Sequence, residues 1–201
     1  GQNNNVTFQG KDGETVVTVG GANDAPTVTV GLAEAFKQKI ENGAIHYFSV
    51  DSKEPADPAG TNWNNDGAKG TGAVAIGSFA NAVSRTGLAT AVGSRTAAAG
   101  QGANAYGGGI AAGEGTVAIG QNAVAASKPG ITKEEYDALR EYNQKFYISG
   151  NNGLYYQYQH QDGKRINDEK NYNIAIGSGT ESYANQTVSL GYKAKSDVDG
   201  G

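Results

Sequence analysis

A short unit made of a small residue, a larger apolar residue and glycine recurs through this sequence and restricts its possible folds more than any other feature. The recurring glycines are Gly77, Gly93, Gly107, Gly120, Gly177 and Gly191. They are spaced 16, 14 and 13 residues apart in the first block and 14 residues apart in the second. A nearly constant period of this length is typical of a solenoid, in which every repeat forms one coil and stacks on its neighbours.

The residues of one unit alternate in size as they would along a β-strand. In residues 73–77 (AVAIG) the side chains of Val74 and Ile76 point to one side of the strand, and Ala75 points to the other. Glycine then accepts the positive φ angles that the tight corners of a coil require. A thin coil cannot bury the bulky side by itself, so we expect Val74, Ile76 and their equivalents Val92, Val117 and Ile119 to pack against another chain. The sequence therefore predicts a mostly all-β parallel solenoid that oligomerises.

Several motifs occur in a specific order around these repeats. Residues 73–82 (AVAIGSFANA) and 116–125 (TVAIGQNAVA) each place a second pair of small residues after the unit. Residues 46–52 (HYFSVDS) and 64–68 (NNDGA) come before them. In this order the motifs resemble the heads of trimeric autotransporter adhesins of the YadA type, over about 44–126 and 173–201.

The resemblance carries expectations about fold and function. It implies a left-handed parallel β-roll that forms a parallel homotrimer. It also implies display at the bacterial cell surface, with an anchor in the outer membrane supplied by parts of the full-length protein absent from this segment. The expected partners are extracellular matrix proteins, host cells or neighbouring bacteria, as in co-aggregation and biofilm. By the same resemblance, the V-A-I-G segments make Val74, Ile76, Val117, Ile119, Ile174 and Ile176 ligand-binding candidates. Ala73 and Thr116 stand where the best-known binding heads carry Ser, which separates this chain from the collagen-binding pattern.

The first 43 residues differ from the repeats. Short β-like runs lie at 6–8, 15–19 and 27–30, and we expect the first two to pair as a hairpin. Residues 31–42 predict a short helix with an apolar stripe of Leu32, Phe36 and Ile40. We expect that stripe to pack on the same chain or on a symmetry mate. The expected organisation is therefore a β and helix segment at 1–43, head repeats at 44–126 and 173–201, and an insertion at 127–172.

The insertion differs sharply in composition from the repeats that flank it. It holds seven of the eleven tyrosines, whereas residues 73–126 contain three charged residues. Thr132 and Glu135 have the spacing of a capping box, which predicts a helix over about 133–144. Residues 146–149 and 154–158, joined by a Gly and Asn segment, predict a hairpin. We expect this insertion, rather than the uniform repeats, to give the protein its specificity.

The tyrosines of the insertion admit two interpretations. In the first they form a small core that holds the insertion on the roll. In the second they form a recognition surface, since Tyr offers a large contact area and a polar tip. Adjacent tyrosines in a strand point to opposite faces, so one face of the hairpin is open to a partner unless both faces are covered. The ligand-binding candidates here are Tyr147, Tyr155, Tyr156 and Tyr158.

Composition argues against other functional classes. The only histidines, His46 and His160, are far apart and the chain has no cysteine, so the sequence predicts no catalytic site, no metal and no cofactor. A net charge of −4 gives no electrostatic case for nucleic acid, and no apolar run of this segment is long enough for a membrane contact.

Two alternatives to an adhesin remain open from the sequence. One is a non-binding structural fibre or spacer, such as a phage tail fibre. The other is a left-handed β-helix acyltransferase, a fold with strict six-residue steps and a catalytic histidine. The repeat here is near 14 residues and neither histidine lies in it.

Overall fold

The structure is a computed structural model that describes residues 7–41, 50–51, 60–84, 87–158 and 172–197. The chain divides into two compact units, Gly1–Ser49 and Val50–Gly201. The second unit contains the repeats and the insertion together.

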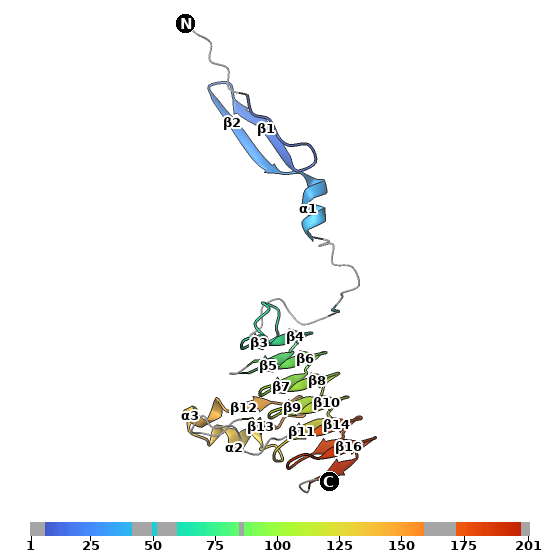
Figure 1. Cartoon of the computed structure of the whole chain (residues 1–201). Coiled ribbons are helices and arrows are strands. Elements are labelled where there is room, and N and C mark those ends of the chain that lie inside the picture. Colours follow the sequence, from blue (N-terminus) through green and yellow to red (C-terminus); the bar gives the residue numbers. More distant parts are fainter. Residues whose placement is uncertain (1–6, 42–49, 52–59, 85–86, 159–171, 198–201) are drawn as a thin grey trace. The chain divides into compact units, whose positions relative to one another are not determined.

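The first unit contains a two-stranded hairpin and a short helix (Figure 1). Strand β1 (Thr15–Ala22) pairs antiparallel with β2 (Ala25–Leu32), and a two-residue loop of Asn and Asp joins them. The expected pairing of 6–8 with 15–19 is therefore wrong, because the closer partner across a tight turn is 25–32. Helix α1 spans Glu34–Glu41, so Leu32 lies in β2 and only Phe36 and Ile40 of the expected stripe are helical.

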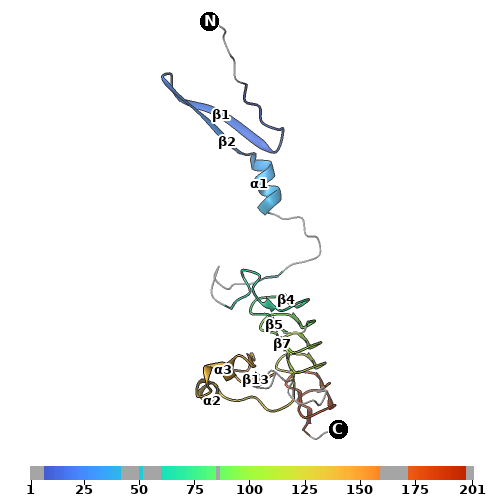
Figure 2. The ribbon, with the colours of Figure 1, turned by 60° about the vertical axis from the view of Figure 1, so that its left-hand side comes forward.

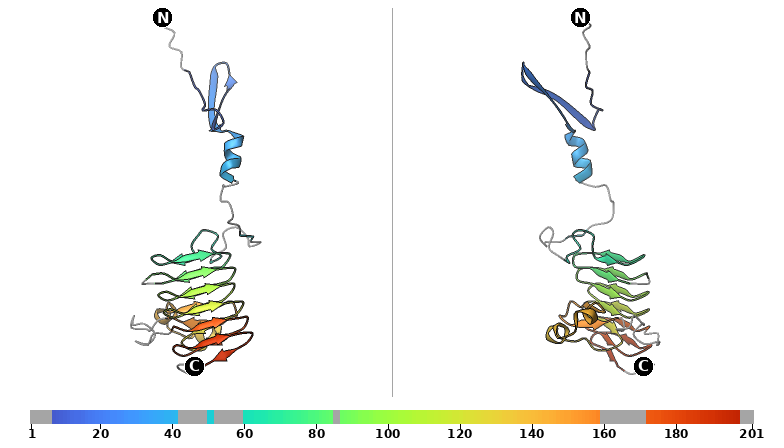
Figure 3. Two further views of the ribbon diagram at one scale, coloured as in Figure 1. Left: turned by 45° about the vertical axis from the view of Figure 1, so that its right-hand side comes forward. Right: turned by 90° about the vertical axis from the view of Figure 1, so that its left-hand side faces the viewer.

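The second unit is a β-solenoid built from two parallel sheets, as the repeats predict (Figure 3). The six-stranded sheet contains β4 (Val74–Ile76), β6 (Thr90–Val92), β8 (Asn104–Tyr106), β10 (Val117–Ile119), β14 (Ile174–Ile176) and β16 (Val188–Leu190). The seven-stranded sheet contains β3 (Ala68–Lys69), β5 (Asn81–Val83), β7 (Ala97–Ala99), β9 (Ile110–Ala112), β11 (Val124–Ala126), β15 (Glu181–Ser182) and β17 (Lys195–Ser196). Each coil from β4 onward thus gives one strand to each sheet.

Alanine fills the space between the two sheets. The buried cluster in the interior consists of Ala80, Ala82, Ala89, Ala91, Ala98, Ala103, Ala105, Ala111, Ala118, Ala123, Ala125 and Ala175. Only small side chains fit between sheets this close together, and Ser182 and Ser189 take the equivalent inward positions in the last coils. The small residue of each repeat unit therefore points inward, and the bulky residues point away from the coil.

Residues 127–172 leave the solenoid after β11 and return to it at β14 without disturbing the register. Val117 of β10 pairs with Ile174 of β14, just as it pairs with Asn104 of β8 on its other side. The insertion is thus an excursion at one corner of a coil. Its described part lies beside the roll, as Figure 2 shows for α2, α3 and β13.

The insertion has two helical turns and a hairpin. Strand β12 (Tyr147–Ser149) pairs antiparallel with β13 (Tyr155–Gln157), which confirms the predicted hairpin. The single helix expected at 133–144 is broken into α2 (Lys133–Asp137) and α3 (Glu141–Gln144). Arg140 is extended at the break, and the side-chain amide of Gln144 donates to the carbonyls of Tyr136 and Leu139 at the end of α2.

Candidate binding surfaces of the roll

The outer face of the six-stranded sheet carries two ladders of mostly apolar side chains. A ladder here is a row of residues aligned across neighbouring strands. The first ladder contains Val74, Thr90, Asn104, Val117, Ile174 and Val188. The other ladder contains Ile76, Val92, Tyr106, Ile119, Ile176 and Leu190. Ile76, Val92, Val117 and Ile174 are half-buried, and the other bulky members are exposed, up to 63% for Leu190. We call this surface the apolar face.

The apolar face brings together all six repeat residues singled out from the sequence. Val74, Ile76, Val117, Ile119, Ile174 and Ile176 lie on the six-stranded sheet, in register, on one side. Contiguous apolar patches of this kind are uncommon on monomeric soluble proteins and mark interaction sites. Whether these side chains contact a ligand stays a prediction.

The outer face of the seven-stranded sheet differs because the insertion covers it. Ile110 and Val124 are buried there among the small side chains of Ala97, Ala99, Ala112 and Ala126. Ile148 of β12 and Tyr156 of β13 pack onto these residues from the hairpin. We call this contact the insertion seat.

The tip of the hairpin is anchored at a corner of the roll. The side-chain amide of Asn151 donates to the carbonyl of Gly108 at 2.7 Å. A Cβ on Gly108 would lie 3.1 Å from that amide nitrogen, so only glycine leaves the tip this close. The sequence analysis missed this anchor, although the three consecutive glycines at 107–109 mark an unusually open corner.

Tyr156 is a core residue of the insertion seat. It is 1% exposed, so the expectation that it is available to a partner is wrong in this arrangement. Its hydroxyl accepts a hydrogen bond from the Asn152 amide at 2.7 Å and shares a second hydrogen bond with the hydroxyl of Tyr183. Burial raises the pKa of both Tyr156 and Tyr183 above the ordinary value of 10.0. Tyr183 lies outside the insertion, in a segment that the sequence analysis did not single out.

The other three tyrosine candidates lie on the opposite side of the hairpin or at its end. The Tyr155 ring stacks on Tyr136 with centroids 4.0 Å apart, and Tyr147 meets Tyr136 edge-on at 6.0 Å. The Tyr158 hydroxyl donates to the carbonyl of Lys145. All three remain half-buried, so part of each ring faces solvent. Burial also raises the pKa of Tyr147, and burial is the largest cause of the raised pKa of Tyr136.

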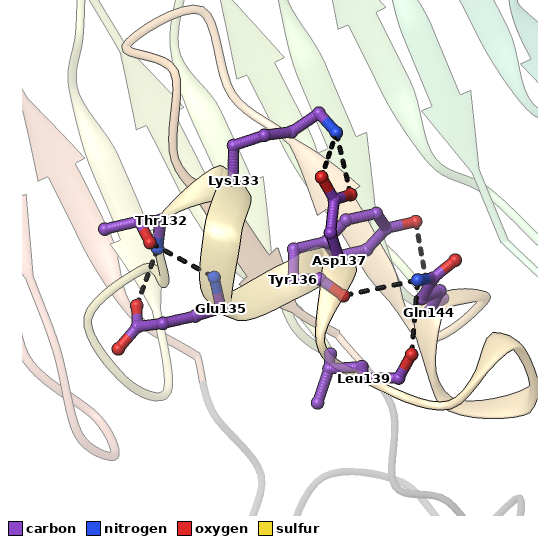
Figure 4. A network of polar contacts seen from close by, with 7 residues as sticks. All are labelled: Thr132, Lys133, Glu135, Tyr136, Asp137, Leu139 and Gln144. Atoms are coloured by element: carbon purple, nitrogen blue, oxygen red, sulfur yellow. Dashed lines mark hydrogen bonds and ion pairs between the residues drawn. The ribbon is translucent and has the colours of Figure 1, made fainter.

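Helix α2 covers that outer side of the hairpin and is held by local contacts (Figure 4). The predicted capping box is confirmed: the Thr132 hydroxyl accepts from the Glu135 amide, and the Thr132 amide donates to the Glu135 carboxylate. Lys133 and Asp137 form an exposed ion pair. The hairpin therefore packs on the roll with one side, and α2 covers part of the other side through Tyr136.

The described residues offer little chemistry beyond binding surfaces. Within those ranges no three His, Cys, Asp or Glu side chains group as metal ligands, and His46 and His160 lie outside them. None of the helices described is long and apolar enough to cross a membrane. Comparison with models of protein families, with curated proteins and with solved structures returned no match.

Proposed function

We propose that this chain is the head of a bacterial surface adhesin, and that three copies assemble in parallel as left-handed rolls with their apolar faces toward a common axis. The observation that carries the proposal is the apolar face, a row of valine and isoleucine on a coil whose interior is filled by alanine. The resemblance of the repeats to trimeric adhesin heads supports the number three, the handedness and the location at the cell surface.

The physical argument for assembly rests on area. Burying apolar surface contributes about 25 cal/mol per Å², and fully burying one Val, Leu or Ile side chain is worth roughly 1.5–3 kcal/mol. Each chain presents nine such side chains on its two ladders. Even partial burial of these side chains against a second and third copy favours association over exposure to water.

This proposal assigns the two groups of candidate residues to different tasks. A side chain in the trimer core cannot also contact a ligand, so the residues of the apolar face hold the assembly together. The attachment surface then lies on the outward side, where the insertion presents the half-buried rings of Tyr147 and Tyr155, whereas Tyr158 packs against the insertion seat. Three outward surfaces per head raise the effective concentration for weak binding to matrix proteins, host cells or other bacteria. No chemical reaction is part of this function.

Sedimentation and attachment assays test the two halves of the proposal separately. Sedimentation of the purified chain should give three times the 20.6 kDa mass of one chain. Beads coated with this species should attach to cells or to surfaces of matrix protein. A stable monomer overturns the assembly, and a trimer that attaches to no cell, matrix protein or glycan supports a spacer in place of an adhesin.

A further inference from the structure

The hairpin of β1 and β2, in the first unit, is a two-stranded ribbon with two different faces (Figure 1). Strand register places on one face the side chains of Val17, Val19, Val28, Val30 and Leu32. The opposite face carries Val16, Thr18, Thr27 and Thr29. We call the apolar one of the two the hairpin face. A sheet with one apolar and one polar face normally buries the first and exposes the second to solvent.

Within the described part of the chain, most of the hairpin face is uncovered. Val19 and Val30 are 68% and 63% exposed. Val28 and Leu32 are exposed as well, and Val17 is half-buried. A two-stranded hairpin is marginally stable at best in water, and becomes stable when further strands or a packed face are added. The hairpin face therefore needs a partner.

Both long edges of the hairpin are also open in the single chain. The amide of Ala33 donates to the carbonyl of Glu14, which fixes how hydrogen bonds alternate along the two strands. The N–H and C=O groups of Val17 and Val19 then point away from β2, and those of the facing residues of β2 point away from β1. The described residues offer these groups no hydrogen-bond partner. The ribbon thus presents a row of unpaired backbone groups on each side.

These edges lack most of the features that prevent strand pairing. Natural proteins protect open edges with charged side chains, with proline or with very short strands. Each strand here has 8 residues, none of them charged, and the one proline, Pro26, lies next to the turn. Two copies of such a ribbon meet no charge repulsion along their strands. The edges are therefore suited to pairing with another copy of the same hairpin.

We propose that the hairpins of neighbouring copies of this chain pair edge to edge, β1 of one copy antiparallel to β2 of the next, and enclose their hairpin faces. The two strands have the same length and opposite directions, so the open edge of one complements the open edge of the other in a second copy. Repeating this contact around a ring pairs every edge and turns every hairpin face inward, as in a closed sheet. The first unit thus has an assembly surface of its own, separate from the apolar face of the roll.

This inference rests on the proposed assembly of the rolls. Each edge offers only a few unpaired groups, so pairing between free copies is weak. Assembly through the apolar face raises the effective concentration of the hairpins for one another. Hairpin pairing should therefore accompany the assembled mass and disappear when the rolls dissociate.

Hydrogen exchange of backbone amides, measured by NMR on the assembled full chain, tests the pairing. In an unpaired hairpin the amides of Val17 and Val19 exchange fast, whereas that of Thr18, which is bonded to β2, exchanges slowly. In paired hairpins all three should exchange slowly, since one hydrogen bond slows exchange by about tenfold. Fast exchange at Val17 and Val19 in a chain of assembled mass overturns the pairing and leaves the proposed assembly. A parent chain with the mass of a single chain overturns the assembly and the pairing together.

The variant Val30→Asp tests the hairpin face, and Thr29→Asp is its matched control on the opposite face of the same strand. Val30→Asp places a carboxylate in the enclosed interior, so the amides of Val17 and Val19 should exchange about tenfold faster. The mass should remain that of the parent, because the rolls still hold the copies together. Thr29→Asp should leave both amides near their parent rates. Equal effects of the two variants, or none from either, overturn the enclosure of the hairpin face.

Discussion

In the middle coils the two outer faces of the roll are both apolar, yet only the face of the seven-stranded sheet is covered there by its own chain. On the seven-stranded sheet the insertion seat buries Ile110 and Val124 under Ile148 and Tyr156. On the six-stranded sheet the side chains of the apolar face remain half-exposed or exposed within the single chain. The chain therefore covers one of the two faces with its own insertion and leaves the other exposed within the single chain.

The two outer faces differ in the size of their outward side chains. The insertion seat contains alanines at most outward positions of β7, β9 and β11, so the large rings and branches of the hairpin fill the space above them. The apolar face has valine, isoleucine, leucine or tyrosine at those positions, with Thr90 and Asn104 as exceptions. Rows of bulky side chains can interdigitate with similar rows on another molecule, which supports the proposal that a second copy packs on the apolar face.

The strongest test of the difference between the two faces is to introduce an aspartate on each face of the same coil. Ile119→Asp on β10 should dissociate the assembly, because a carboxylate would be buried without compensation near the axis at a cost of several kcal/mol per copy. Sedimentation should then report the mass of a single chain. An Ile119→Asp variant that keeps the mass of the parent would contradict the assignment of the apolar face.

The matched change on the other face is Val124→Asp on β11. Val124 is buried under the insertion in the same chain, so this variant should unseat the insertion and leave the assembled mass unchanged. Protease sensitivity confined to residues 127–158 would report the release. If both variants dissociate the assembly equally, the two faces do not have separate tasks.

Removing the largest ring of the insertion seat should have the next largest effect. Tyr156→Ala should destabilise docking of the hairpin by about 3–5 kcal/mol, the usual cost of truncating a buried aromatic side chain. Hydrogen exchange should accelerate in β12 and β13 while the strands of the roll keep their protection. Tyr142→Ala is the control: its ring is exposed and contacts Phe146 edge-on, so its loss should destabilise the insertion by only about 0.5–1.5 kcal/mol.

High pH should also act on the insertion seat. Burial raises the pKa of Tyr156 and Tyr183, so these groups stay protonated in the folded state when exposed tyrosines ionise. Docking is fully stable below pH 10, near the ordinary tyrosine pKa, and loses stability as pH rises toward the raised values. Ultraviolet absorbance of phenolate together with hydrogen exchange of β13 measures this loss. In Tyr156→Phe the pH dependence should be weaker, and an unchanged profile would show that Tyr156 is not responsible.

The sequence predicted the features that repeat or that depend on neighbouring residues. The spacing of the glycines and the alternation of small and bulky residues predicted the parallel coils and the outward direction of Val74 and Ile76. The spacing of Thr132 and Glu135 predicted where α2 begins. Contacts between distant residues were missed. The broken helix depends on Gln144 reaching back to two carbonyls, and the burial of Tyr156 depends on Tyr183 and on alanines many residues away. Residues 44–49 of the expected entry segment lie outside the described residues.

The smallest expected effects come from substitutions at α2, on the outer side of the hairpin. They test whether the contacts of the insertion seat depend on α2. Thr132→Ala removes the side-chain half of the capping box and should destabilise α2 by about 1 kcal/mol. Lys133→Ala removes an exposed ion pair one residue further on and should cost less than Thr132→Ala, an effect that disappears in high salt. Hydrogen exchange resolves the two through the amides of α2. Because Ile148 and Tyr156 pack on the roll from the other side, β12 and β13 should keep their protection in both variants. If Thr132→Ala also frees the hairpin, α2 is part of what seats the insertion, and the seven-stranded face depends on more than its own contacts.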